Sequence, residues 1–523
     1  MVEEGKSRLY ALKPLTDRLP AVTKPVGHVH FRTKMLWVVL ILVLYFALTN
    51  VFIYGLDPAE TIDVFANLRA ILAGAQGSLM HLGIGPIVTG SIIMQLFAGA
   101  KIIKLDLTDD EDKAVYQGTQ KLLVIIMIVV EAIPQVFGFL HPSSGFVAGM
   151  EAFAPGQGEL LANTTIVAQL FMGSYIVFLM DEVVSKWGLG SGVSLFIAGG
   201  VAQQIFVGTF NWIPTDSSGI PPGTIPKTLW YLNNMSAAGV SQGGFERILL
   251  QSPNPIIALV GTVVIFLIVA YAESMRIELP LAHGAARGAR GRYPIRLIYA
   301  SNIPVILMAA VLANVSMFSL LFWNNPDWPL VGQQWWIGSY PATEAQAVAL
   351  GISRTTPMTG VAYYLSTVNG VGDWLLPLLG PDRYSHLLRG HAYWQVLAHV
   401  IIYVGVMVVG SIIFARFWIE TTNMGPDAVA RQIESSGMQI PGFRRDPRVL
   451  RRVLERYIPA VTVISGAAVG ALAAGADMIG TVGNASGTGV LLAVGILIQF
   501  YEAMGREQMM EMHPVLRGFF GSE

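Results

Sequence analysis

The chain has 523 residues, of which 53% are hydrophobic and only 13% are charged, and its formal net charge is −1. A soluble protein of this size carries about a quarter charged residues, so the composition fits a polytopic membrane protein. The small net charge argues against a nucleic-acid binder that works by bulk positive charge. The absence of cysteine excludes disulfides, thiolate metal sites and cysteine nucleophiles.

Ten apolar segments follow one another along the chain, and each can hold the roughly 20 apolar residues that a membrane-spanning helix needs. Nine carry no charge, and one is interrupted only by Glu131. The last segment is the weakest, because its first part is rich in glycine. We therefore predict ten transmembrane helices, at 35–56, 70–100, 122–139, 161–180, 187–215, 248–272, 297–326, 390–415, 457–476 and 478–501.

The basic residues predict the orientation of these helices. If the N-terminus is inside and the sides alternate, 27 of the 33 Lys and Arg residues fall on the inner side. Cytoplasmic loops carry such an excess in membrane proteins. Both termini are therefore expected in the cytoplasm. The outer side keeps six basic residues, which are Arg69, Lys227, Arg247, Arg354, Arg383 and Arg389.

The second apolar segment, 70–100, is too long to be one helix. A continuous helix over it would measure about 46 Å, well beyond the hydrocarbon core. Gly74, Gly77, Gly83, Gly85 and Pro86 lie within it. Such a density of glycine and proline predicts a short half-helix followed by a spanning helix. Broken helices occur where they line a cavity or pack inside protein, so this segment indicates a pore or a substrate site.

The connecting segments are uneven. Many of the basic residues lie in the inner loops 273–296 and 416–456. This concentration reflects either the general excess of basic residues on the inner side or a docking surface for a large anionic partner such as a ribosome. Two outer loops are long, about 210–251 and 323–389. Residues 1–34 carry leucines near helical spacing with Lys and Arg between them, and we expect an amphipathic helix on the inner membrane surface.

The residues give little indication of catalytic chemistry. Gly5-Lys6-Ser7 resembles the end of a phosphate-binding loop but lacks the preceding glycine, and the nine histidines show no metal-ligand spacing. Glu131 is the clear intramembrane carboxyl group, and it is either a proton relay or a hydrogen-bonded structural group between helices. We expect neither an enzyme nor a bound metal or cofactor.

Several stretches resemble the SecY family, the channel-forming subunit of the protein translocase, over nearly the whole chain. The sequences of these stretches are more similar to the archaeal branch of the family than to the bacterial one. The stretches are GIGPIVTGSIIMQLFAGAKII (83–103), QGTQKLL (117–123), DEVVSKWGLGSGVSLFIAGGVAQ (181–203), AESMRIELPLAHG (272–284), YPIRLIYASNIPVIL (293–307), AYYLS (362–366), GMQIPGFR (437–444) and GTGVLL (487–492).

The resemblance implies an all-α fold of ten transmembrane helices in two pseudo-symmetric five-helix halves. The halves would be 35–209 and 252–510, joined by an outer hinge loop at 210–251 and flanked by cytoplasmic segments at 1–34 and 511–523. A re-entrant plug half-helix would lie at about 62–76, with the small residues Ala73, Gly74, Ala75 and Gly77 at its end. An apolar ring at the waist of the pore would consist of Ile84, Val88, Val193, Ile197, Ile306 and Leu492.

The resemblance also implies a lateral gate between helices 2–3 and 7–8, through which signal sequences leave into the lipid bilayer. Its polar cluster would be Thr89, Glu131 and Asn314, which gives Glu131 a structural role. Ribosome docking would use basic residues of the two inner loops, which are Arg276, Arg287, Arg290, Arg292, Arg444 and Arg445.

The implied activity is that of the central pore subunit of a protein-conducting channel in the cell membrane. Unfolded secretory polypeptides would cross through it. The implied partners are a SecE/gamma-type subunit, a beta-type subunit, the ribosome and the nascent chain.

An inverted-repeat transporter for a small solute is the competing interpretation. It requires polar groups beside the break in 70–100. The break is flanked instead by apolar residues such as Leu82, Ile84 and Val88, which favours the channel.

Overall fold

A computed structural model describes residues 7–512 apart from 28, 58–71, 100–101, 104, 106–108, 215–218, 235–244, 251–253, 284–289, 297–301, 328–329, 351, 381–383, 423, 436–437, 440–446 and 484. Within this part, nine helices are long and apolar enough to span a membrane. They are α2 (Phe31–Leu48), α5 (Asp110–Gly138), α7 (Gly158–Trp187), α8 (Gly192–Phe210), α12 (Ile256–Ser274), α13 (Ile303–Asn324), α18 (Tyr393–Thr421), α20 (Pro447–Ile479) and α21 (Gly487–Met512).

The remaining predicted span is shorter and is interrupted as expected. Helix α4 (Gly85–Gly99) begins only after a run of turns and bends over residues 73–84. With α4 counted, the structure is consistent with ten membrane helices. Residues 62–71 of the expected plug half-helix lie outside the described residues, so only its end at 72–76 can be compared.

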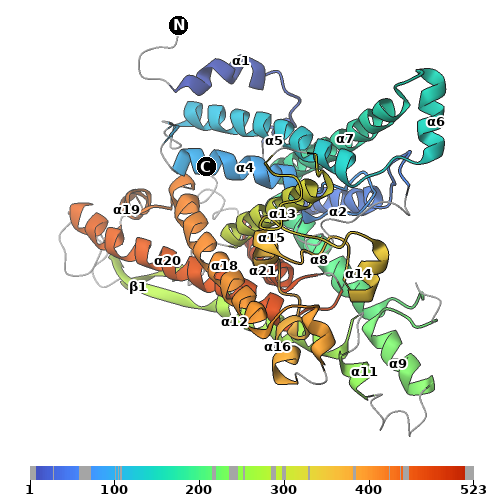
Figure 1. Cartoon of the computed structure of the whole chain (residues 1–523). Helices are drawn as coiled ribbons and strands as arrows, with labels where there is room; N and C mark the ends of the chain where they lie inside the picture. The colour runs from blue at the N-terminus through green and yellow to red at the C-terminus, as the bar shows by residue number, and fades with distance from the viewer. Residues whose placement is uncertain are drawn as a thin grey trace.

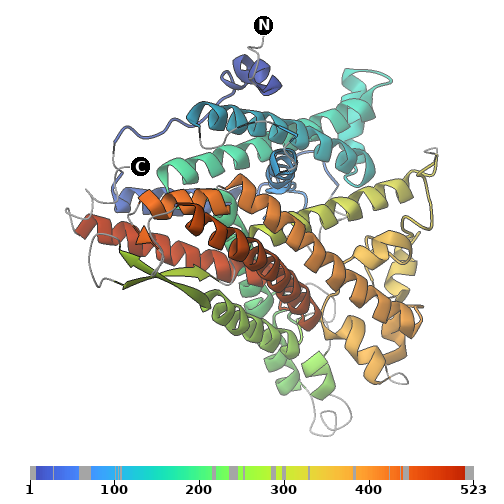
Figure 2. The same cartoon turned by 90° about the vertical axis from the view of Figure 1, so that its left-hand side faces the viewer.

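The two ends of the molecule carry different short elements (Figures 1 and 2). One end carries η1 (Arg8–Leu12), α1 (Lys13–Thr16), α19 (Pro426–Ser435) and the strands. The other carries α6 (Ser144–Phe153), α9 (Thr224–Asn234), α11 (Phe245–Leu250), α14 (Glu344–Leu350), α15 (Gly360–Leu365), α16 (Val371–Leu379) and η3 (Ser385–Leu388).

The strands form a small sheet that the sequence analysis did not predict. Strand β1 (Arg276–His283) pairs antiparallel with β2 (Arg290–Arg296) and with β3 (Met438–Gln439). The predicted all-α membrane fold is confirmed, and this small sheet in the connecting loops is an addition to it. Because β1 and β3 come from the two basic loops, the sheet joins those loops into one surface.

The beginning of the first membrane helix contacts the end of the last one. The backbone N–H of Phe31 donates to Glu511 Oε1 over 2.6 Å, and Lys34 Nζ lies 2.7 Å from Glu507 Oε1. The beginning of α2 and the end of α21 therefore lie on the same side. An even number of membrane crossings requires this arrangement.

The N-terminal segment packs against protein through polar contacts. The Tyr10 hydroxyl donates to Asp112 Oδ1 over 2.5 Å, and Lys13 pairs with Glu111 at 3.2 Å. Both acidic residues lie in the first turn of α5. The segment is thus docked on the beginning of α5, and its expected position on the membrane surface stays a prediction.

Candidate functional site

Helix α13 lies at the centre of the molecule. It contacts α4 and α5 on one side and α18 on the other, and Figure 1 shows it between α4 and α18. Of its apolar window, 67% is buried, the largest share among the described spans. A helix that is apolar all round is expected to be enclosed by others. The lateral gate was predicted at the seam where the α4–α5 pair faces the α13–α18 pair.

The predicted ring residues come from four elements. Ile84 directly precedes α4 and Val88 lies on it, whereas the others lie on α8, α13 and α21. Five are buried and Val193 is half-buried, and all six belong to one continuous apolar core that contains Ile84, Val88, Val193, Ile197, Ile306 and Leu492. Their burial agrees with an apolar constriction. That they close as a ring stays a prediction.

The end of the predicted plug segment contacts the first ring residue directly. The backbone N–H of Ile84 donates to the carbonyl oxygen of Leu72 over 2.8 Å. On the other side of the segment, the Tyr45 hydroxyl of α2 donates to the carbonyl oxygen of Ala73 over 2.9 Å. Leu72 and Ala73 are both buried. Residues 72–73, the end of the predicted plug, are therefore held between α2 and a predicted ring position.

The turn that follows the plug end requires a glycine at position 83. Gly83 has φ +56°, and a Cβ atom there would lie 2.0 Å from the carbonyl oxygen of Leu72. Real Cβ atoms do not approach so closely, so any side chain would displace the backbone of 72–74. Glycine adopts this left-handed conformation without steric cost.

The other plug residues lie in the same compact turn. The Ala75 N–H donates to the carbonyl oxygen of Met80, and the carbonyl oxygen of Gly77 accepts from the Ile53 N–H over 2.9 Å. Gly74 stands between these anchored residues. The turn is thus tied to the chain that follows α2, and it leads directly into α4.

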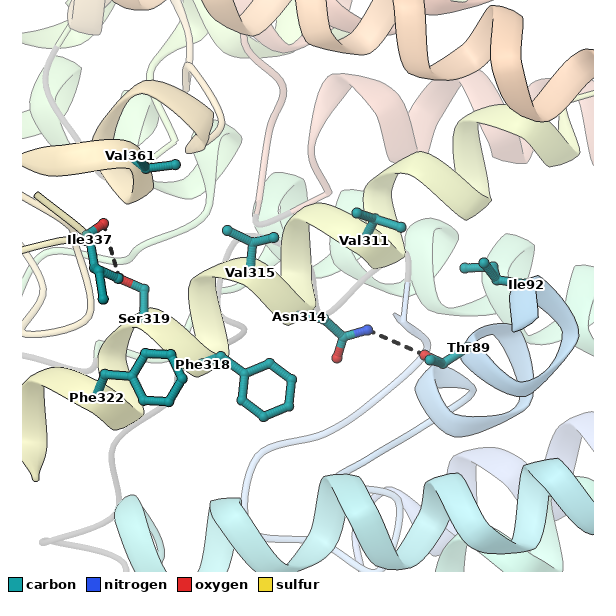
Figure 3. Close-up of a pocket in the computed structure, with 10 residues that line it drawn as sticks. All are labelled: Thr89, Ile92, Val311, Asn314, Val315, Phe318, Ser319, Phe322, Ile337 and Val361. Atoms are coloured by element: carbon teal, nitrogen blue, oxygen red, sulfur yellow. Dashed lines mark hydrogen bonds between the residues drawn. The ribbon is translucent and has the colours of Figure 1, made fainter. Parts of the chain in front are cut away.

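The three predicted gate residues lie together, one on each of three helices. Asn314 Nδ2 of α13 donates to Thr89 Oγ1 of α4 over 3.3 Å, as Figure 3 shows. The Thr89 hydroxyl donates to the carbonyl oxygen of Gly85 over 3.0 Å, and a Cβ atom at Gly85 would lie 3.0 Å from Glu131 Oε2 of α5. Oε1 of Glu131 is buried without a hydrogen-bond partner. The cluster therefore joins the two sides of the seam through a small number of polar contacts.

Two further bonds cross the seam between α5 and α13. Gln135 Nε2 donates to the sulfur of Met317 over 3.8 Å, and Asn324 Nδ2 donates to the carbonyl oxygen of Gly138 over 3.5 Å. Both are long for hydrogen bonds, so each contributes little. These residues cannot be predicted from the sequence, because nothing in an apolar segment distinguishes a bond across a seam from one within a helix.

A cavity of about 380 Å³ opens beside the Asn314–Thr89 bond. Figure 3 shows side chains of α4 and α13 around it, together with two from the outer loop. Apart from Thr89, Asn314 and Ser319, the lining is apolar, and it consists of Ile92, Val311, Val315, Phe318, Phe322, Ile337 and Val361. Such a lining suits an apolar segment. Among the described residues no group of three or more His, Asp or Glu is placed to hold a metal ion.

The predicted docking arginines are described only in part. Arg276 begins β1, is half exposed and lies 3.7 Å from Glu502 of α21. Arg290 and Arg292 occupy alternate positions of β2. Arg287, Arg444 and Arg445 lie outside the described residues.

Two family models match this chain, and together they cover most of it. The SecY family model matches residues 78–501, and the model for the plug domain of Sec61p matches residues 43–77. The protein translocase subunit SecY of Archaeoglobus fulgidus is 45% identical over 99% of both chains. That of Haloferax volcanii is 44% identical over 98% of this chain and 99% of its own.

Solved structures agree with the sequence relatives. A structure described as a protein conducting channel matches with a TM-score of 0.73 and 37% identity, over 96% of this chain and 98% of its own. Sec61 in a canine ribosome-channel complex matches with a TM-score of 0.70 and the same identity and coverage. Neither comparison supports a small-solute transporter. The chain belongs to the SecY family.

Proposed function

We propose that this chain is the central pore subunit of a protein-conducting channel, which passes unfolded polypeptides across the membrane and releases transmembrane segments sideways into lipid. The observation that carries the proposal is the arrangement around Ile84. There the end of the predicted plug is bonded to a predicted ring residue, and five residues further along the chain Thr89 of α4 is bonded to Asn314 of α13.

The apolar ring suits a channel whose cargo varies in sequence. Branched aliphatic side chains close around any extended chain and exclude ions by dewetting, without fixed polar groups that would select one substrate. In the resting state the plug end at Leu72 and Ala73 adds a second barrier next to the ring. An arriving chain displaces this segment by breaking the few backbone bonds that hold it.

The seam opens when an apolar signal helix replaces its contacts. Hydrogen bonds between membrane helices contribute about 0.6–2 kcal/mol each. Burial of an apolar helix in the cavity offsets this easily, since each buried methylene contributes about 0.8 kcal/mol. A sufficiently apolar signal therefore opens the gate, and a polar segment leaves it closed.

The chain is a channel and not an enzyme, so the driving force comes from a partner. A translating ribosome docked on the inner basic loops supplies it, and arginine suits the contact because its planar group binds phosphate in pairs. A SecE/gamma-type subunit clamps the two halves, and a beta-type subunit joins them. The complex lies in the cell membrane with both termini in the cytoplasm.

A chain without native cysteine permits a direct test. Single cysteines at Val88 and Ile306 are placed opposite a secretory chain that is stalled midway and carries a thiol-reactive probe. Both are expected to crosslink. Val39→Cys, which is 54% exposed on the outer face of α2, is expected not to. Absence of crosslinks at Val88 and Ile306 in folded, partnered complexes would remove the pore assignment.

A further inference from the structure

The long outer loop supplies part of the gate cavity. Eight of its lining residues lie on α4 and α13, but Ile337 and Val361 come from the segment between α13 and α18. In Figure 3 Ile337 and Val361 stand on the side of the cavity away from Thr89. The cavity therefore has a wall that belongs to neither gate helix.

Two strips of the loop build this wall by pairing with each other. The N–H of Met358 donates to the carbonyl oxygen of Ser339 over 2.7 Å, and that of Ala362 donates to Ile337 over 2.9 Å. The Val361 N–H donates to the carbonyl oxygen of Trp336 over 2.9 Å. We call residues 335–340 and 358–366 the outer cap. These backbone bonds make it one compact unit.

The outer cap packs against α13. Tyr340 is 4% exposed, so its burial is the main anchor. Two long hydrogen bonds accompany it, from the Tyr340 hydroxyl to the carbonyl oxygen of Ser316 over 3.4 Å and from Ser319 Oγ to that of Ile337 over 3.5 Å. The cap therefore contacts one of the gate helices directly.

The outer cap is also fixed to α18. His399 Nε2 lies 2.9 Å from the carbonyl oxygen of Ser366. The ring of Tyr363 stacks on His391 with centroids 4.2 Å apart and lies 4.5 Å from the ring of His399. The cap thus bridges the outer ends of α13 and α18, the two helices on one side of the seam.

We propose that the outer cap forms the outer wall of the signal-binding site, with Val361 and Ile337 contacting the outer end of an apolar signal helix. This inference rests on the proposed function. Val361 is 49% exposed although it is apolar and belongs to an otherwise fixed unit, so it is available to a helix that enters the cavity. The cap then contributes to how apolar a signal must be.

The test uses three single-cysteine variants and a stalled secretory chain with a photoreactive probe near the outer end of its apolar segment. Val315→Cys, on α13, reports the gate itself. Val361→Cys reports the cap, and Leu379→Cys is the control, since Leu379 lies on α16 of the same outer loop, is 73% exposed and does not line the cavity.

The expected result is a crosslink at both Val315 and Val361 and none at Leu379. A crosslink at Val315 without one at Val361 overturns the cap inference and leaves the gate intact. If neither position crosslinks, the proposed function fails as well. The two failures are therefore distinguishable.

A second measurement uses translocation of signals with graded leucine content. Val361→Ser is expected to raise the required content by about one leucine, because the wall loses two methyl groups and gains a hydroxyl. Leu379→Ser also replaces an apolar residue of the same loop by serine, and it is expected to leave the required leucine content unchanged. An unchanged requirement in both variants would contradict a role of the cap in signal selection.

Discussion

Gly83 and Gly77 occupy the same compact turn and both have positive φ, yet their surroundings differ. At Gly83 a Cβ atom would collide with the backbone of the plug end, whereas at Gly77 its nearest neighbour would be Phe52 Cδ1 at 3.8 Å. An alanine at either position bears the cost of left-handed backbone, about 1–2 kcal/mol. Only Gly83→Ala also displaces residues 72–74.

This difference predicts unequal ion leakage through the resting channel. Gly83→Ala detaches the plug end from Ile84, so proteoliposomes that contain it are expected to leak ions several-fold faster than wild type. Gly77→Ala serves as the matched control and is expected to stay near wild type. Equal leakage in the two variants, at equal amounts of folded protein, would contradict the plug contact.

At the scale of elements, the bond between α4 and α13 predicts a coupled pair. Thr89→Val and Asn314→Leu each remove the same hydrogen bond, worth about 0.6 kcal/mol or roughly a threefold change in the ratio of open to closed gate. Each single variant is expected to pass signals with fewer leucines than wild type needs. The double variant is expected to add little to either, as a double-mutant cycle of translocation efficiency would show. Additive effects, or an unchanged threshold, would contradict the bond as a gate contact.

The attachment of the outer cap predicts a dependence on outer pH. Burial, then His399 and then Arg389, hold the pKa of His391 below its usual 6.5. A detached His391 regains that value and binds protons more readily, so cap attachment weakens as pH falls below about 6.5. The charged and titratable groups around it are His399, Arg389, Asp373 and Tyr363.

Amide hydrogen exchange of residues 358–366 at pH 7.5 and 5.5, corrected for intrinsic rates, measures this effect. Wild type is expected to lose protection at the lower pH. His391→Phe keeps a ring against Tyr363 but does not titrate, so its loss is expected to be smaller. Equal losses in the two proteins would assign the dependence to another group.

Elements differ in how far the sequence predicts them. The break before α4 is confirmed, and it follows from local chemistry because glycine and proline interrupt a helix at their own positions. The juxtaposition of Thr89, Glu131 and Asn314 depends on contacts between distant helices, so it came from the family resemblance and not from spacing. The outer cap is held together by backbone hydrogen bonds between two strips about twenty residues apart in the sequence, and no pattern of side chains predicts such bonds.

The β1–β2 hairpin shows the same limit in the inner loops. Its sequence, rich in Arg and Gly, was interpreted by charge alone. Strand pairing adds information that charge does not contain, because β3 brings the second basic loop beside the first. The N-terminal segment is a related case, since Asp112 and Glu111 give Tyr10 and Lys13 polar partners on protein that an isolated amphipathic pattern does not reveal.

At the scale of the whole molecule, α4 and α5 meet α13 at a seam that few polar bonds cross. The beginning of α2 and the end of α21 are joined by Lys34 and Glu507, whereas α4 and α13 face each other across the cavity. An opening motion that separates α4 from α13 therefore breaks few polar bonds. This asymmetry explains how one chain both conducts polypeptides and releases membrane helices sideways.

The seam can be locked chemically because the chain has no other thiols. The double variant T89C/N314C replaces two side chains whose atoms Thr89 Oγ1 and Asn314 Nδ2 are 3.3 Å apart. Oxidation or a short thiol crosslinker then joins α4 to α13 covalently. The locked channel is expected to stop both secretion and membrane insertion, and reduction is expected to restore them, while each single-cysteine variant stays active. Full activity of a completely crosslinked double variant would contradict entry of signals between α4 and α13.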